Sequence, residues 1–145
     1  MEKSNLFKKL KKEILDIYKS IDFIIVFGSY AKEHYSELSD IDIAIHFSKM
    51  PDILELGYII AKLEAKLCKK IDIIILNELY KKNAKFCRQI ITEGIVLYVS
   101  DNNKFIEFKK NSLLYYLDLK DLYEKNIKKF LERIERNKIG EQNYV

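Results

Sequence analysis

The sequence contains little glycine or proline, few cysteines and no long apolar segment. Four glycines and one proline in 145 residues leave no sign of an interdomain linker or of long irregular loops. No apolar run is as long as a membrane-spanning helix, which needs about 20 residues. The charged residues at the N-terminus are not followed by the apolar core of a signal peptide. These absences favour one cytoplasmic domain that does not enter a membrane.

The two cysteines are also informative through what they lack. Cys68 and Cys87 have neither CxxC nor CxH spacing, which argues against a structural zinc site. We interpret them as reduced thiols rather than as a disulfide.

The charged residues are of both signs. The net charge is +4, from 26 basic and 22 acidic side chains, which is compatible with an anionic ligand such as a nucleoside triphosphate but does not predict one. The densest basic cluster is interpreted first as a solvated helix face and second as a site for an anionic partner. This cluster consists of Lys8, Lys9, Lys11 and Lys12.

Hydrophobic periodicity predicts an α/β fold with a small mixed sheet of three to four strands flanked by helices. The sheet core is expected over about residues 20–99, followed by a long C-terminal helix. Strands are expected at 22–27, 41–47, 71–76 and 94–99, and helices at 4–19, 51–69, 79–92 and 103–137. On the last helix an apolar stripe is formed by Leu113, Leu117, Tyr123, Ile127, Phe130 or Leu131, and Ile134.

A Gly-Ser pair follows the first predicted strand. Gly28 permits close approach of the backbone to a phosphate, and Ser29 adds a hydroxyl. A short helix at 29–33 would offer free N–H groups and the positive end of its dipole. The pair therefore indicates a phosphate-binding turn when it occurs together with a metal site.

An acidic pair begins the second predicted strand. Because side chains alternate between faces, Asp40 and Asp42 share one face while Ile41 and Ile43 point to the core. Their Cα atoms would be about 6.6 Å apart, so both carboxylates can converge on one cation. In the third predicted strand, Asp72 is a candidate third ligand. Crowded carboxylates of this kind are neutralised by hard divalent cations, and Mg²⁺ with substrate phosphates is the common form.

Three further side chains lie near these motifs. Lys32 either reaches a phosphate as a point charge or is merely exposed, and Ser39 either contacts the nucleotide or shapes the turn. His46 lies on the acidic face but at the far end of the strand, which places it away from the chemistry.

The run FGSYAKEHYSELSDIDIAI, at 27–45, together with Asp72, resembles the signature of the DNA polymerase β-like nucleotidyltransferase superfamily. It is most similar to the minimal MntA-type antitoxins of HEPN/MNT toxin–antitoxin pairs. The resemblance covers nearly the whole chain, including its small size and its closing helix. It implies a single minimal nucleotidyltransferase domain over 1–145.

The resemblance also implies roles. Gly28 and Ser29, with Lys32 and Ser39, would bind the nucleotide. Metal would be bound by Asp40, Asp42 and Asp72, of which Asp72 would also help to deprotonate the acceptor. The cofactor would be two Mg²⁺ ions and the substrate ATP, with AMP transferred to a tyrosine of a cognate HEPN (HepT-type) toxin in a hetero-oligomer. Direct nucleic-acid binding is not implied.

The sequence departs from this family at one place. Many relatives have Arg-Gly where this chain has Lys32 and Glu33. Lysine keeps the positive charge but lacks the bidentate geometry of arginine. Binding of the triphosphate is therefore expected to differ from that in these relatives.

Two other functions are compatible with the sequence. The chain could neutralise a partner by binding alone, through its long helices and with a vestigial nucleotide site. It could also modify a small molecule, although enzymes of that kind usually carry a further substrate-binding domain.

Overall fold

The computed structural model describes residues 3–33, 35–36 and 38–143, with side chains described as far as residue 137. Its centre is a four-stranded mixed sheet in the order β3-β2-β1-β4. The strand β1 (Ile21–Phe27) pairs antiparallel with β2 (Ile41–Phe47) and with β4 (Ile95–Val99), whereas β3 (Ile71–Ile75) runs parallel to β2. The mixed sheet expected from the sequence is therefore confirmed.

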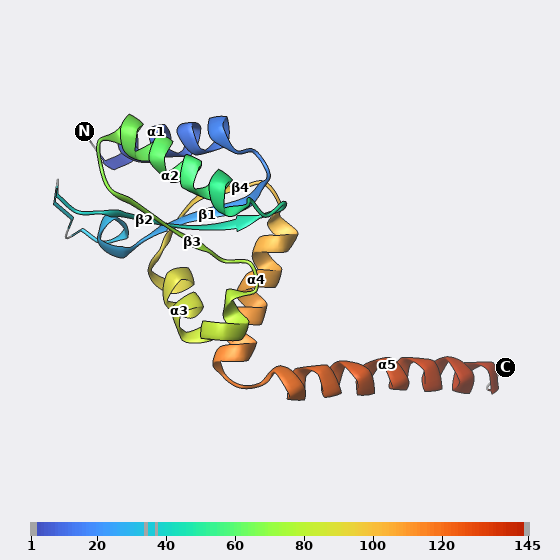
Figure 1. Ribbon diagram of the computed structural model, residues 1–145. Coiled ribbons are helices and arrows are strands. Elements are labelled where there is room, and N and C mark those ends of the chain that lie inside the picture. The colour runs from blue at the N-terminus through green and yellow to red at the C-terminus, as the bar shows by residue number, and fades with distance from the viewer. Residues whose placement is uncertain (1–2, 34, 37, 144–145) are drawn as a thin grey trace.

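Helices cover both faces of this sheet (Figure 1). On one face α1 (Lys3–Ile17) and α2 (Ile53–Leu67) pack against β1 and β2, and on the other face lie α3 (Leu79–Glu93) and α4 (Asn102–Tyr116). Each layer encloses its own apolar cluster. The domain thus has three layers with the sheet in the middle.

The alternation along β2 divides its side chains between the two layers. Ile41, Ile43 and Ile45 are completely buried in the cluster under α1 and α2, whereas Ala44 belongs to the cluster under α3 and α4. Asp42 shares the face of Ala44 because side chains two residues apart point the same way. The predicted separation of isoleucines and aspartates on this strand is confirmed.

The sequence predicts a single helix over 103–137, and this prediction is wrong. The chain forms two helices, α4 and then α5 (Lys120–Asn143), separated by a short turn. In that turn Asp118 has a φ of 56°, a left-handed conformation that an α-helix cannot continue through. Aspartate tolerates this conformation better than most residues, so the break needs neither glycine nor proline. A long C-terminal helix is nevertheless present, as α5.

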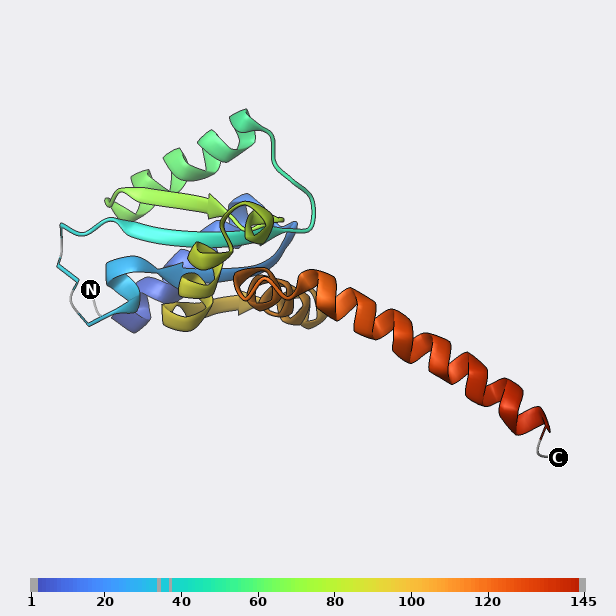
Figure 2. The same ribbon diagram turned by 90° about the horizontal axis from the view of Figure 1, so that it is seen from below.

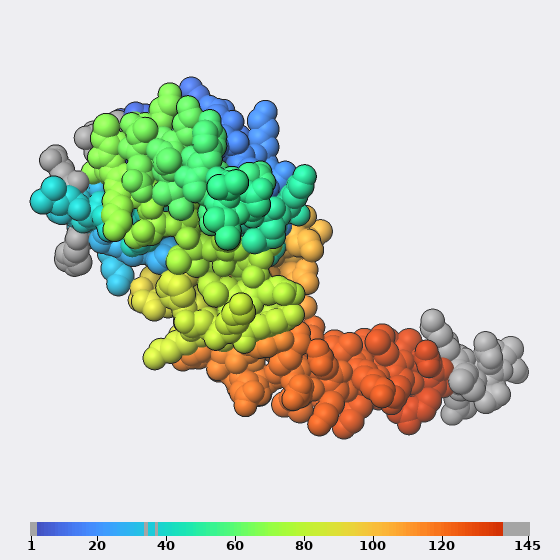
Figure 3. Space-filling model, in the orientation of Figure 1, coloured from blue at the N-terminus to red at the C-terminus, as the bar shows by residue number. Residues whose placement is uncertain are grey.

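The helix α5 extends away from the layered domain in both ribbon views (Figures 1 and 2). The space-filling view shows the same projection as an arm that stands clear of the domain surface (Figure 3). Within the described part of the chain, no helix combines the length and the apolar character needed to cross a membrane.

Candidate nucleotide and metal site

The turn after β1 places the backbone of Gly28 directly against Asp42. Gly28 opens a 3-10 turn, η1 (Gly28–Ala31), with a φ of 71°. A Cβ atom at this position would overlap Oδ2 of Asp42 and lie 3.1 Å from its Cγ. The two residues meet because the preceding residue, Phe27, is paired with Asp42 in the sheet. Both the backbone conformation and the available space therefore require glycine.

Asp42 and Asp72 are nearest neighbours across two parallel strands. The register of β2 and β3 pairs Asp42 with Asp72, so their Cα atoms are about 4.8 Å apart and their side chains leave the same face. Asp42 is half-buried and Asp72 is exposed. Asp40 lies immediately before β2 and is also half-buried.

The carboxylates influence one another electrostatically. Burial, followed by the charges of Asp72 and Asp40, raises the pKa of Asp42 above its usual range. A divalent cation would offset this repulsion, and an all-oxygen donor set suits a hard cation such as Mg²⁺.

The cation would need further ligands. Among the side chains that the structure describes, no group of three or more His, Cys, Asp or Glu residues is arranged to hold a metal ion. Mg²⁺ is commonly held by one or two carboxylates and completes its shell with water and substrate phosphates. Asp42 and Asp72, with Asp40 beside them, fit this kind of site.

The loop between η1 and β2 is held in place by Tyr30. This side chain is buried, its ring stacks on Tyr35 with 4.8 Å between centroids, and its hydroxyl donates to the Ser36 carbonyl at 3.4 Å. Ser39 Oγ accepts a hydrogen bond from the Ser36 N–H at 2.9 Å. Ser39 therefore contributes to the shape of this turn, and its contact with the nucleotide stays a prediction.

The other two predicted nucleotide ligands lie close to this turn. Ser29 follows Gly28 within η1, whose four residues supply N–H groups but not the summed dipole of a long helix. Lys32 Nζ lies 3.4 Å from Glu93 Oε2 at the end of α3, and both side chains are about half exposed, at 52% and 44%. An exposed pair of this kind contributes at most about 1 kcal/mol, so a phosphate can compete for Lys32.

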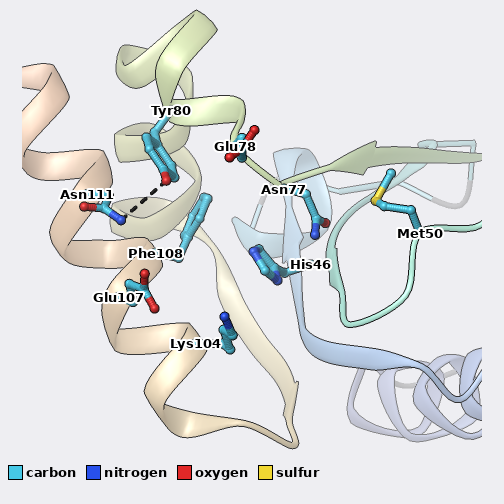
Figure 4. A pocket seen from close by; sticks show the side chains of 9 residues that line it. All are labelled: His46, Met50, Asn77, Glu78, Tyr80, Lys104, Glu107, Phe108 and Asn111. Carbon is cyan, nitrogen blue, oxygen red and sulfur yellow. Dashed lines mark hydrogen bonds between the residues drawn. The ribbon is translucent and has the colours of Figure 1, made fainter.

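A cavity lined by both polar and apolar side chains lies near the other end of β2, away from the three aspartates. It has a volume of about 550 Å³, and Figure 4 shows that its lining comes from β2, from the irregular segments that follow β2 and β3, and from α3 and α4. His46 forms part of this lining, four residues or about 13 Å along β2 from Asp42. The lining residues are His46, Met50, Asn77, Glu78, Tyr80, Lys104, Glu107, Phe108 and Asn111.

The structure also shows a buried pair of side chains that the sequence motifs do not predict. His46 Nδ1 and Asp22 Oδ2 are 2.8 Å apart, and only 8% of the Asp22 side chain is exposed. The His46 ring stacks on Phe23 with centroids 4.9 Å apart. Phe23 pairs with His46 in the sheet, and this register brings the neighbouring Asp22 close to His46. From the sequence, the contact between Asp22 and His46 could have been predicted only from the antiparallel register of β1 and β2.

Comparison with known proteins places this geometry in context. Residues 8–103 match the family model described as polymerase beta, nucleotidyltransferase, and this range contains every candidate site residue. A protein of Methanocaldococcus jannaschii named as a predicted protein adenylyltransferase is 41% identical over 86 residues, which are 59% of this chain and 86% of that protein. A second protein of that name and organism is 39% identical over 103 residues, covering 63% of this chain and 97% of its own length.

Solved structures share the fold. One chain in a structure of tri-AMPylated Shewanella oneidensis HEPN toxin in complex with MNT antitoxin matches this protein with a TM-score of 0.65 and 22% identity. The match covers 90% of this chain and 99% of that chain. A toxin–antitoxin structure with AMP-PNP matches with a TM-score of 0.67 and 23% identity, over 86% of this chain and 98% of that chain. At these identities the likeness concerns the arrangement of helices and strands.

Proposed function

The chain belongs to the polymerase beta nucleotidyltransferase family, and from that premise we propose that it is a Mg²⁺-dependent protein adenylyltransferase. Its substrate is ATP, and it transfers AMP to a tyrosine of a cognate HEPN ribonuclease toxin, which the modification neutralises. Added AMP places a bulky anion near an RNA-cleaving site and repels RNA phosphates, as other charge-adding modifications do.

One observation carries this proposal. The Gly28 backbone lies against Asp42, which is itself in register with Asp72 on the next strand. The turn that we propose to bind phosphate and the two aspartates that we propose to bind the cation are therefore adjacent, as transfer of a nucleotide from its triphosphate requires.

The names of similar proteins support the choice of AMP and of a protein acceptor. Two relatives, at 41% and 39% identity, are named as predicted protein adenylyltransferases. The structural neighbours include a HEPN toxin that carries AMP in complex with its antitoxin, and a toxin–antitoxin structure with AMP-PNP.

The chain's own residues divide the reaction between them. The Gly28-Ser29 turn binds the triphosphate, and Asp40, Asp42 and Asp72 would hold Mg²⁺. When bound, the metal lowers the cost of charge on the phosphates and on the leaving group. A bond forms between the tyrosine oxygen and the α-phosphorus, the bond from that phosphorus to pyrophosphate breaks, and Asp72, which is exposed, accepts the tyrosine proton.

The test combines the protein with ATP, Mg²⁺ and a candidate HEPN toxin, for which the product of the gene next to its own is tried first, and measures the mass of that candidate. We expect an increase of one or more AMP units with the native protein and none with Asp40→Ala or Asp42→Ala. If the native protein adds no AMP and the two variants behave as it does, the proposal is wrong.

The exposed arm α5 favours a second candidate function, inhibition by binding alone. In that case the partner would be neutralised by occlusion and the carboxylates would not be needed. Protection of cells from the toxin by Asp42→Asn would establish this alternative, whereas loss of protection would exclude it.

A further inference from the structure

The cavity beside His46 is separate from the nucleotide turn and from the aspartates. Its volume of about 550 Å³ lies within the range of small-molecule sites, which is about 300–1,000 Å³. His46 is on the same face of the sheet as Asp42 but about 13 Å further along β2. None of the residues that line the cavity has a part in the proposed function, so a ligand bound here would be a second one.

The imidazole of His46 is held in one orientation by three neighbours. Nδ1 lies 2.8 Å from Asp22 Oδ2, and it donates in this bond because a carboxylate only accepts. The ring centroid lies 4.9 Å from that of Phe23 and 5.9 Å from that of Phe108. Nε2 is therefore the ring nitrogen that is left for a ligand in the cavity.

Two other polar side chains of the lining already have partners. The Asn77 amide accepts from the Phe47 N–H at 2.9 Å and donates to the Phe47 carbonyl at 2.8 Å. Glu78 Oε1 lies 3.0 Å from Lys81 Nζ. These contacts make Asn77 and Glu78 part of the wall rather than ligand-binding groups.

Two opposite charges on α4 are left without a partner. Lys104 and Glu107 lie one turn apart at the mouth of the cavity, on the same side of α4 as Phe108 (Figure 4). Among the described residues, neither forms an ion pair with the other or with a third side chain. Pairing between them would contribute at most about 0.5 kcal/mol, so a ligand can hold them apart. The cavity thus offers one ammonium group and one carboxylate.

The surface between these charges is largely aromatic. Phe108 is buried, and its ring centroid lies 6.0 Å from that of Tyr80. The Tyr80 hydroxyl accepts a hydrogen bond from Asn111 at 3.4 Å. Burial raises the pKa of Tyr80, so its hydroxyl keeps its proton at neutral pH and can donate to a ligand. An apolar group with a hydrogen-bond acceptor beside it would fit this surface.

We propose that the cavity binds a small zwitterion of the amino-acid class. The carboxylate of the ligand pairs with Lys104, its ammonium group pairs with Glu107, and its apolar side chain lies against Phe108. The Tyr80 hydroxyl is available to the carboxylate and His46 Nε2 to the ammonium group. This site does not depend on the proposed function.

Ligands of a single charge fit the lining less well. A phosphate ester would gain one ammonium group but would be repelled by the carboxylates of Glu107 and Glu78. A polyamine would leave Lys104 without a partner and add a like charge beside it. Only a molecule with both charges satisfies Lys104 and Glu107 together, which gives the site its specificity.

The experiment measures binding of each standard L-amino acid to the full chain by calorimetry, and maps the bound ones by amide NMR. The test variant is Lys104→Gln with Glu107→Gln, two exposed positions at which folding is not disturbed. Its matched control is Lys125→Gln with Glu132→Gln, two exposed positions on α5 with the same change of charges. We expect at least one amino acid to bind the native protein and to shift amides of the cavity lining. Its Kd should rise at least about tenfold for the test variant and stay within about twofold for the control.

Analogues of the bound amino acid test the need for both charges. The amine that lacks the carboxylate and the acid that lacks the ammonium group should each bind at least about tenfold more weakly. Asp42→Asn should bind the amino acid with the native Kd while transferring no AMP, which separates this site from the proposed function.

Four outcomes would overturn the site. These are no binding of any amino acid up to about 10 mM, equal binding by the test variant and the native protein, an analogue of single charge that binds as tightly as the amino acid, and loss of binding in Asp42→Asn. A failure of AMP transfer in the native protein would refute the enzyme and leave this site unaffected.

Discussion

Asp42 is the residue at which folding and chemistry make opposite demands. Its pKa is raised by burial and by the charges of Asp72 and Asp40, so the metal-free protein is less stable when Asp42 is ionised. The stabilising contribution of the neutral form is complete below the ordinary pKa of aspartate and is lost as the pH rises through the higher folded value. Above the folded pKa this penalty should be present in full.

We therefore predict that Asp42→Asn raises the Tm at pH 7.5 in EDTA while reducing AMP transfer more than about 100-fold. The gain in Tm should shrink as the pH falls through the raised pKa of Asp42, because the native carboxyl then becomes neutral. Mg²⁺ with ATP should raise the Tm of the native protein and not that of the variant. Thermal unfolding followed by circular dichroism measures the three Tm effects: the gain in EDTA, its dependence on pH, and the response to Mg²⁺ with ATP. A lower Tm for the variant than for the native protein in EDTA would contradict the argument.

Gly28 offers a second test, with a control in the same chain. Gly28→Ala places a Cβ against Asp42 at a positive φ, which should cost about 1–3 kcal/mol of unfolding free energy and most of the activity. Gly57 lies on the exposed side of α2, and a Cβ there meets nothing within 4 Å. Gly57→Ala should therefore stabilise by about 0.5–1 kcal/mol with no loss of activity. Urea unfolding of both variants measures the difference, and similar effects at the two sites would show that Gly28 has no special role.

At this scale the sequence predicted more of the site than of its surroundings. The Gly-Ser and the aspartates could be found because a strand pattern fixes which faces they share. The pairing of Asp22 with His46, and that of Lys32 with Glu93, could not be found in the same way. Each joins residues far apart in the chain, so it depends on strand register or on the packing of α3 against the end of β1.

At the scale of the elements, the two cysteines differ in burial and in thiol pKa, because only Cys87 lies in the layer of α3 and α4. Cys87 is completely buried in the apolar cluster under these helices, and burial raises the pKa of its thiol from 9.0 to about 11. Cys68 is exposed at the end of α2.

We predict that a thiol reagent at pH 8 modifies one cysteine in the folded protein and two in urea, as counted by mass spectrometry. Between pH 9 and about 11 the unfolded Cys87 thiol ionises before the folded one, so the stability that it contributes should fall with rising pH across that window. Rapid modification of both cysteines without denaturant would show that the layer opens easily.

The elements themselves followed from periodicity except at the junction of α4 and α5. Isoleucine-rich runs predicted β1, β2 and β3 to within one residue, because buried strands need β-branched side chains. The helix break was missed because Leu117, Asp118 and Leu119 contain no glycine or proline to mark it. The left-handed conformation of Asp118 marks the break, and an aspartate in the sequence does not by itself signal such a conformation.

At the scale of the whole molecule, the layered domain and the arm should be energetically separate. A chain shortened to end at residue 119 should unfold with nearly the same Tm and should still bind Mg²⁺ and ATP, because α5 buries no side chain over residues 120–137. Its urea m-value should also change little, since that slope follows the surface buried on folding. A loss of several degrees in Tm would show that α5 supports the domain.

The separation of α5 from the sheet also determines how its backbone hydrogen bonds open. A helix without tertiary packing is marginally stable in water, whereas the central strand β1 opens only when the whole domain unfolds. Amide hydrogens over residues 120–137 should therefore exchange with deuterium orders of magnitude faster than those of β1.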